Sequence, residues 1–165
     1  MEQLRVTSLH PGELIIGKTL PYLAISMVAT AIIILAARVL FGVVVRGPYL
    51  DLFVATLIYL VGALALGLFV SSVAESQAMA FQIGMVLSLL PAIFLSGFIF
   101  PIRSMPLVVQ AITYAIPTRY FNVILRGVIL KGAGLSSYLK DLGFLVLYAT
   151  VVLGVSYARL TRKEA

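Results

Sequence analysis

The stretch LDLFVATLIYLVGALALGLFVSSV, residues 50–73, is apolar almost throughout, and Asp51 is its one charged side chain. A helix needs about 20 predominantly apolar residues to cross the hydrocarbon core of a bilayer. Because no water is available in that core, a spanning chain must satisfy its backbone hydrogen bonds internally, as a helix does. Residues 50–73 are therefore predicted to form a transmembrane helix, and this stretch decides the fold class.

Three further stretches meet the same criterion, and they comprise residues 19–45, 78–100 and 141–160. Of the 165 residues, 62% are hydrophobic and 11% are charged. Soluble domains are instead about 45–50% apolar and about 25% charged. The chain is therefore predicted to be all-α, a polytopic transmembrane helical bundle with about four spans that form a single membrane domain over residues 1–165.

A different kind of stretch interrupts this pattern before the fourth predicted span. SGFIFPIRSMPLVVQAITYAIPTRYFNVILRG, residues 96–127, mixes apolar side chains with three arginines and three prolines. The prolines divide it into two short helical runs, residues 107–116 and 118–130, since proline disfavours helix at the residue before it. Runs of about 10–14 residues are typical of re-entrant or interfacial segments. Residues 101–140 are thus predicted to form either a re-entrant helical hairpin or an interfacial loop with two amphipathic helices.

The N-terminal residues 1–18 are more polar, and HPGE places Pro11 where a helix begins favourably. Basic residues near both ends, including Arg5 and Arg159, indicate cytoplasmic termini, because Lys and Arg are enriched on the cytoplasmic side. Residues 101–140 then lie outside the cell although they carry five basic residues, since the rule weakens for a long, half-inserted segment. Topology and anionic headgroups, rather than nucleic acid, account for the net charge of +6.

Several polar and small residues inside the predicted spans have structural and functional interpretations. Arg38 is costly in a bilayer unless its side chain reaches the interface, or unless it faces a substrate or another helix. Ser72 and Glu75 are predicted to form a capping box before the third span. Asp51 is expected to pair weakly with Arg46.

Small residues recur at every fourth position in three of the predicted spans. Such spacing lets helix backbones approach closely, either within the bundle, at a dimer interface or along a substrate path. The residues are Ala63, Gly67, Ser71, Ala80, Gly84, Ser88, Ala92, Ser96, Gly154 and Ala158.

Few residues favour chemistry in this chain. It has no cysteine, and His10 is its only histidine. Neither a disulfide nor a cysteine- or histidine-based metal centre is therefore expected. The sequence also lacks a Gly-rich phosphate-binding loop followed by Lys and Ser or Thr, a zinc-protease motif and a nucleophile elbow. We therefore expect no enzymatic activity, and no cofactor or metal bound by this chain.

The most specific motifs are SGFIFPIRSMP (residues 96–106), YAIPTRYF (residues 114–121) and LRGVILKG (residues 125–132). EQLRVTSLHPGELIIGKTLPY, residues 2–22, precedes them near the N-terminus. With these motifs in this order, nearly the whole chain resembles the membrane subunits of bacterial ATP-binding-cassette exporters of type 2, and the multidrug-type members look closest.

The resemblance implies roles for two groups of residues. A re-entrant segment at the outer leaflet would cap the translocation path on the extracytoplasmic side. Its matching positions are Gly97, Pro101, Met105, Pro106, Pro117, Tyr120 and Arg126. A cytoplasmic coupling helix would contact the ATPase and transmit its closing motion. Its residues are Glu2, Gln3, Leu4, Arg5, Val6 and Thr7.

The implied function is that of a permease subunit, or the C-terminal part of one, which exports drugs, lipids or other amphipathic substrates. It would be a multi-pass protein of the bacterial cytoplasmic (inner) membrane. ATP and Mg²⁺ would bind to a separate ATPase subunit, and a second permease copy would complete a homo- or heterodimer. Because such permeases resemble six-span proteins, an N-terminal portion with two spans is expected to be missing here.

The alternative function is a small membrane protein without transport activity, such as a scaffold or an assembly factor, or a degraded permease remnant. Binding of an ATPase by residues 2–13 would exclude the small protein without transport activity.

Overall fold

The computed structural model describes residues 11–164, together with the side chains of residues 16, 17 and 19–159. The four main helices are α1 (Pro11–Phe41), α2 (Tyr49–Val73), α3 (Gln77–Leu90) and α6 (Leu139–Glu164). The shorter elements are the π-helical turn η2 (Pro91–Leu95), η3 (Ile102–Ser104), α4 (Leu107–Thr113), α5 (Pro117–Lys131) and η4 (Leu135–Tyr138). Residues 11–164 contain no strand, and four of their helical stretches are long and apolar enough to cross a membrane. The predicted all-α class with about four spans is confirmed.

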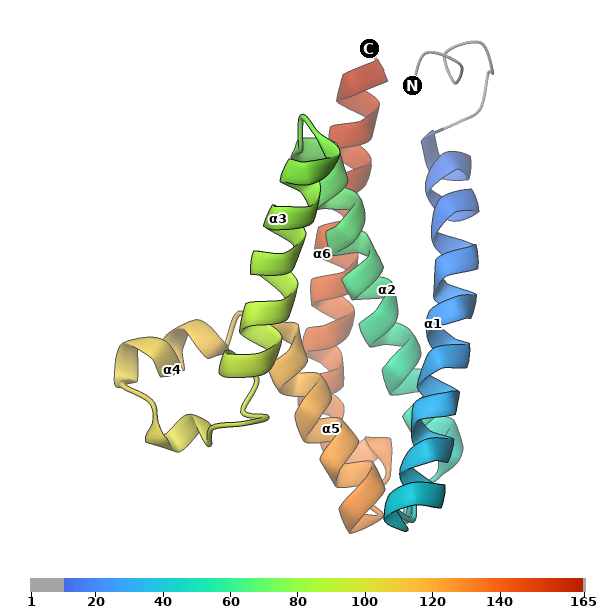
Figure 1. Ribbon diagram of the computed structural model, residues 1–165, viewed down its shortest axis with the longest axis vertical. Helices are drawn as coiled ribbons and strands as arrows, with labels where there is room; N and C mark the ends of the chain where they lie inside the picture. Colours follow the sequence, from blue (N-terminus) through green and yellow to red (C-terminus); the bar gives the residue numbers. More distant parts are fainter. Residues whose placement is uncertain (1–10, 165) are drawn as a thin grey trace.

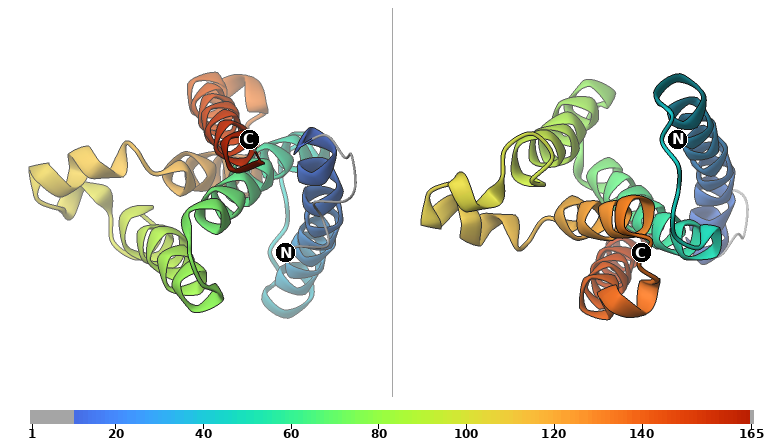
Figure 2. Two further views of the ribbon diagram at one scale, coloured as in Figure 1. Left: turned by 90° about the horizontal axis from the view of Figure 1, so that it is seen from above. Right: turned by 90° about the horizontal axis from the view of Figure 1, so that it is seen from below.

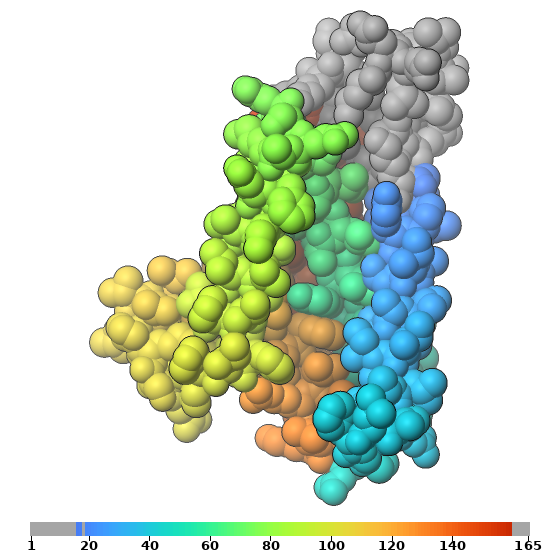
Figure 3. Space-filling view, viewed as in Figure 1, coloured from blue at the N-terminus to red at the C-terminus, as the bar shows by residue number. Residues whose placement is uncertain are grey.

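The four candidate spans run along the long axis of the molecule, with α2 and α6 side by side at its centre (Figure 1). The beginning of α1, the turn between α2 and α3 and the end of α6 lie at the same end of the bundle, as four successive crossings require. Seen along this axis, α1 and α4 lie on opposite sides of the molecule (Figure 2). On the face drawn in Figure 3, α2 is set back between α3 and α1.

Small residues allow α2 and α6 to pack closely. Gly62 of α2 lies against Tyr148 and Ala149 of α6. The buried hydroxyl of Ser156 in α6 lies 3.1 Å from the carbonyl oxygen of Ala65 in α2, a distance suited to hydrogen-bond donation. Close packing and interhelical hydrogen bonds are the main forces that hold helices together in lipid. The α2–α6 pair is therefore the centre around which the other helices are arranged.

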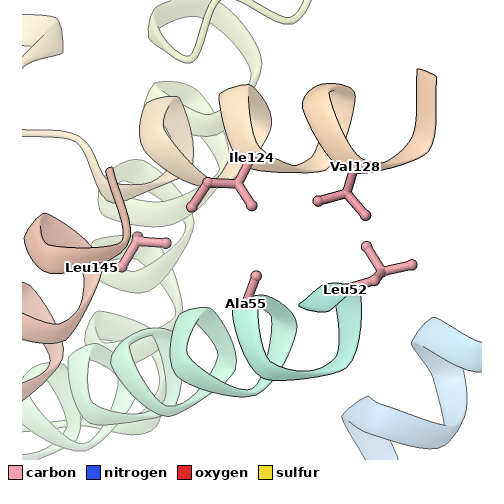
Figure 4. Close-up of a cluster of buried hydrophobic side chains, with 5 residues drawn as sticks. All are labelled: Leu52, Ala55, Ile124, Val128 and Leu145. Atoms are coloured by element: carbon pink, nitrogen blue, oxygen red, sulfur yellow. The ribbon is translucent and has the colours of Figure 1, made fainter. Parts of the chain in front are cut away.

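A compact core joins α5 to this pair. Figure 4 shows its five buried side chains, which point toward one another from α2, α5 and α6. They are Leu52, Ala55, Ile124, Val128 and Leu145. Ile124 and Val128, one turn apart on α5, are fully buried, whereas Arg126 and Lys131 of the same helix are exposed. This amphipathic pattern fixes which face of α5 packs on the bundle.

Two of the predicted spans end earlier than expected. The first was expected to reach residue 45, but α1 ends at Phe41. Gly42 adopts a φ of +64°, and its N–H donates to the carbonyl oxygen of Arg38 at 3.1 Å, which is a common way to end a helix. Arg38 thus lies in the last turn of α1. A cation in that position is favoured by the helix dipole.

The third predicted span ends at Leu95 and not at residue 100. Pro91 has no N–H to continue the α-helical pattern, and the chain forms a π-helical turn from this residue. Gly97 then takes a φ of +77°, which turns the chain out of the helix.

The interpretation of the small-residue stripes as packing within this chain is wrong for several positions. Ala63, Gly67 and Ser71 are all exposed on α2. Apart from the helix backbone itself, nothing described lies within 4 Å of where a Cβ would stand on Gly67, Gly84 or Gly154. The buried face of α2 instead carries Ala55, Gly62 and Ala65.

The predicted capping box before the third span is also wrong. Ser72 lies inside α2, and its hydroxyl donates to the carbonyl oxygen of Phe69 at 2.7 Å. The residue that caps α3 is Ser76, whose hydroxyl accepts a hydrogen bond from the N–H of Met79 at 3.2 Å. Helix α3 therefore begins at Gln77, four residues later than the predicted capping box would place its start.

Candidate functional site

Residues 96–116, here called the lateral segment, leave the bundle after η2 and return to it at α5 (Figure 1). Gly97 makes the first turn of this segment. Its φ of +77° is rarely adopted by other residues, and a Cβ on it would lie 3.1 Å from the side chain of Ile102. Position 97 therefore favours glycine for its backbone conformation, and a side chain there would also press on Ile102.

The next motif positions begin and end the short helices of the lateral segment. Pro101 precedes η3, and Pro106 precedes α4. The backbone N–H of Gln110 donates to the carbonyl oxygen of Pro106 at 3.0 Å. The side-chain Nε2 of Gln110 donates to the carbonyl oxygen of Met105 at 2.8 Å. Pro117 is the first residue of α5, where its missing N–H costs nothing. These prolines and Met105 therefore have structural roles in shaping the segment.

Two side chains of α5 hold the start of the lateral segment. Asn122 donates from Nδ2 to the carbonyl oxygen of Ser96 at 3.3 Å. Arg126, one turn further along α5, donates to the carbonyl oxygen of Phe98 at 3.4 Å. Because helical residues four apart share a face, both contacts come from one side of α5.

Two further side chains of α5 hold the end of the same segment. The Arg119 guanidinium donates to the hydroxyl of Thr113, which is fully buried, and lies 3.9 Å from the centroid of the Tyr114 ring. The hydroxyl of Tyr120 donates to the carbonyl oxygen of Tyr114 at 2.8 Å. Partial burial raises the pKa of the Tyr120 phenol, and the neighbouring Arg119 opposes this rise. The phenol therefore stays protonated at neutral pH and can donate this hydrogen bond.

Aromatic stacking fixes α5 against the central helices. Tyr59 of α2 stacks on Phe121, with ring centroids 4.2 Å apart, and its hydroxyl lies 3.2 Å from that of Thr118. Tyr120 stacks on Phe144 of α6, with centroids 4.0 Å apart. The helix that holds the lateral segment is thus itself held by both α2 and α6.

Backbone contacts tie the connection between α1 and α2 to the end of α5. The N–H groups of Arg46 and Gly47 donate to the carbonyl oxygens of Ile129 and Val128, at 3.2 and 3.0 Å. Asp51 does not pair with Arg46 as expected. Its Oδ2 instead accepts a hydrogen bond from the N–H of Leu135, at 2.7 Å, at the start of η4. This contact satisfies an N–H that a helix start would otherwise leave without a partner.

The structure brings together the predicted motif positions from Gly97 to Arg126, which all lie in the lateral segment or on α5. The predicted coupling residues Glu2 to Thr7 lie outside the described residues. Arg119 and Asn122 were not predicted as site residues from the sequence. Arg119 has a local signal, because it stands inside the YAIPTRYF motif, directly before Tyr120 and Phe121. Among the side chains that the structure describes, no three of His, Cys, Asp or Glu are grouped so as to hold a metal ion.

Comparison with known proteins gives a consistent result. The family model of the ABC-2 type transporter matches residues 1–130. The probable multidrug ABC transporter permease YbhS of Escherichia coli strain K12 is 35% identical over 163 residues, which cover 99% of this chain and 43% of the relative. The probable multidrug ABC transporter permease YbhR of the same strain is 29% identical, with 99% of this chain and 44% of the relative covered.

A more distant relative is the inner membrane transport permease YhhJ of Escherichia coli strain K12. It is 28% identical over 137 residues, which cover 81% of this chain and 36% of the relative. The chain therefore spans less than half the length of these curated relatives. No solved structure gives a significant match.

Proposed function

The chain belongs to the ABC-2 type transporter family, and from this premise we propose that it forms part of the permease of a bacterial exporter. Its substrates are drugs, lipids or other amphipathic compounds, which leave the cell across the cytoplasmic membrane. A separate ATPase subunit binds ATP and Mg²⁺, and a second permease copy and a further portion with two spans complete the path. The multidrug permeases among the relatives and the four apolar helical stretches support this proposal.

In this proposal, residues Glu2 to Thr7 form the coupling helix on the ATPase. Three residues separate them from α1, which is one helix of 31 residues from Pro11 to Phe41. A helix of this length is about 46 Å long, so it can carry a displacement from one membrane face to the other. The connection after α1 is hydrogen-bonded through Arg46 and Gly47 to α5. A push on α1 is thereby passed to α5.

The observation that carries the proposal is the set of four α5 side chains that hold both ends of the lateral segment. They are Arg119, Tyr120, Asn122 and Arg126. Because α5 touches the lateral segment at both ends, a shift of α5 moves the segment as one body. The lateral segment then has two positions, one that closes the extracytoplasmic exit of the path and one that opens it. Such gating needs no covalent chemistry.

The gate is tested by the double substitution Arg119→Ala and Asn122→Ala, which removes one contact from each end of the lateral segment. Each hydrogen bond contributes about 0.5–1.5 kcal/mol, so we expect ATP-dependent efflux to fall several-fold. The measurement is efflux of ethidium from cells that express the whole permease with its ATPase. Arg103→Ala, which removes an exposed arginine of η3, is the matched control and should keep normal efflux.

Equal efflux by the double variant and the Arg103→Ala control would contradict a gating role for α5. Equal ethidium retention by cells with and without the wild-type permease would contradict the export of such amphipathic dyes.

The proposed orientation, with both termini in the cytoplasm, is tested by single cysteines, because the chain has none of its own. Ser136→Cys lies in η4 and Ser76→Cys lies at the start of α3, and both positions are exposed. A maleimide that cannot cross membranes should label Ser136→Cys in intact spheroplasts. It should label Ser76→Cys only after the membrane is permeabilised, and the opposite pattern would reverse the orientation.

A further inference from the structure

The guanidinium of Arg119 lies in a cluster of aromatic and acidic groups at the junction of the lateral segment, α5 and α6. It is 3.9 Å from the ring centroid of Tyr114 and 6.0 Å from that of Tyr120. A cation within about 6 Å of an aromatic ring is attracted to the negative face of that ring. The carboxylate of Asp141, in the first turn of α6, also interacts electrostatically with Arg119. Two rings and one carboxylate therefore hold a cation here.

Asp141 is brought to these rings by the packing of α6 on α5. Phe144 of α6 stacks on Tyr120, with ring centroids 4.0 Å apart. Asp141 precedes Phe144 by three residues, so the two side chains lie on the same face of α6. The electrostatic interaction of Asp141 with Tyr120 agrees with this position. The four contacts that hold the lateral segment do not include Asp141, so they do not explain why an acid stands here.

The position of Arg119 in its helix weakens its attachment to this cluster. Arg119 is the third residue of α5, and the first turn of this helix has no acidic residue. The N-terminus of a helix carries a partial positive charge, which repels a cation in the first turn. Arg119, Tyr120 and Asp141 are half-buried, and Tyr114 is 58% exposed. A ligand can therefore reach the cluster, and the guanidinium can move away from it.

We propose that this cluster binds organic monocations, and that such a ligand displaces the guanidinium of Arg119. The inference rests on the proposed function, because it makes these cations substrates of the exporter. The ligand lies against the ring of Tyr114, and the carboxylate of Asp141 is its counter-ion. Aromatic rings suit organic cations, whereas Mg²⁺ and Ca²⁺ require about six or more oxygen ligands, of which this cluster supplies one carboxylate.

Displacement of Arg119 has a direct effect on the lateral segment. The guanidinium donates to the buried hydroxyl of Thr113, which is one of the contacts at the end of that segment. This hydrogen bond breaks when the guanidinium leaves, whereas the bond from Tyr120 to the carbonyl oxygen of Tyr114 can remain. A substrate cation thus loosens the segment that closes the exit, and so promotes its own release.

The site is tested by the binding of ethidium, an aromatic monocation, to the purified chain in uncharged detergent micelles. Fluorescence polarisation gives the dissociation constant. Arg119→Ala should tighten binding about fivefold, because the ligand no longer competes with the guanidinium. Arg119→Gln should do the same, and it serves if the alanine variant does not fold. Asp141→Asn should weaken binding about fivefold, the effect of one opposite charge about 4 Å away in water, and Asp141→Glu should restore it.

Two control variants remove one exposed charge each outside the cluster, and both should bind ethidium as the wild type does. They are Arg103→Ala in η3 and Glu75→Gln in the turn before α3. Unchanged or weaker binding by both Arg119 variants would overturn the proposal, because Arg119 would then be a permanent part of the fold. Wild-type affinity in Asp141→Asn would overturn it as well.

The efflux assay tests the proposed function separately, because binding to the purified chain needs no transport. Tighter binding by the Arg119 variants, without export of ethidium by the whole permease, would support the cation site and contradict only the proposed export. Normal export with no change of binding in these variants would overturn the cation site and leave the proposed function intact.

Discussion

Replacement of Ile124 by alanine is expected to lower the free energy of unfolding by about 2–3 kcal/mol. Ile124 is fully buried and lies between the side chains of α2 and Leu145 of α6. Truncation leaves a cavity at the point where three helices meet, and a close-packed core fills such a cavity only in part by small movements. This value lies at the lower end of the range for such substitutions. On unfolding in a membrane an apolar side chain becomes exposed to lipid, which carries no penalty, whereas in a soluble protein it becomes exposed to water.

The measurement is unfolding of the purified chain in mixed micelles with increasing denaturing detergent. Leu130→Ala is the matched control, since Leu130 lies on the same helix and is 59% exposed. It should change the free energy of unfolding by less than about 0.5 kcal/mol. Equal destabilisation by the two substitutions would show that α5 is not packed into the bundle as described.

Gly47→Ala is the second substitution with a large expected effect. A Cβ at this position would stand 2.7 Å from the carbonyl oxygen and 2.9 Å from Cγ1 of Val128. The N–H of Gly47 donates to that same oxygen, so the methyl group and the hydrogen bond compete for the same space. Val128 is fully buried and cannot move away. We expect the free energy of unfolding to fall by about 1–3 kcal/mol, as for other overpacked sites, together with looser attachment of the α1–α2 connection to α5.

Hydrogen exchange of the amides of residues 46 and 47 reports this attachment directly, and it should become faster in Gly47→Ala. Gly143→Ala is the matched control, because nothing described lies within 4 Å of a Cβ on this helical glycine. That substitution should stabilise α6 by about 0.5–1 kcal/mol. If Gly47→Ala proved as stable as the control, the contact between the connection and α5 would be absent.

The helical architecture could be predicted from the sequence because its signals are local. Length and apolarity identify a span within one stretch of about 20 residues, and Pro106 and Pro117 indicate where α4 and α5 begin. The end of α1 was missed because Gly42 is followed by three valines, which continue the apolar pattern after the helix has stopped. Apolarity records the membrane environment of a residue but not its backbone conformation.

The contacts that build the candidate site could not be predicted in the same way. Asp51 was assigned to Arg46, five residues away, whereas its partner Leu135 is 84 residues away in the sequence. Asn122 and Ser96 are 26 residues apart. Such pairs depend on how the helices are arranged in space, and no periodic pattern reports that arrangement. The motif positions from Gly97 to Tyr120 were instead implied by the resemblance to type 2 exporters. Among them the prolines also carry a local signal, because helix starts favour proline.

The pairing of α2 with α6 has a consequence for biosynthesis. Ser156 and Ala65, which face each other across this pair, are 91 residues apart in the chain. Ribosomes add about 5–20 residues per second, so α2 enters the membrane roughly 5–20 s before the segment that will cover it has been made. During this interval the buried face of α2 meets only lipid or the insertion machinery. Completion of the core is therefore a late event, which takes place when the last span leaves the ribosome.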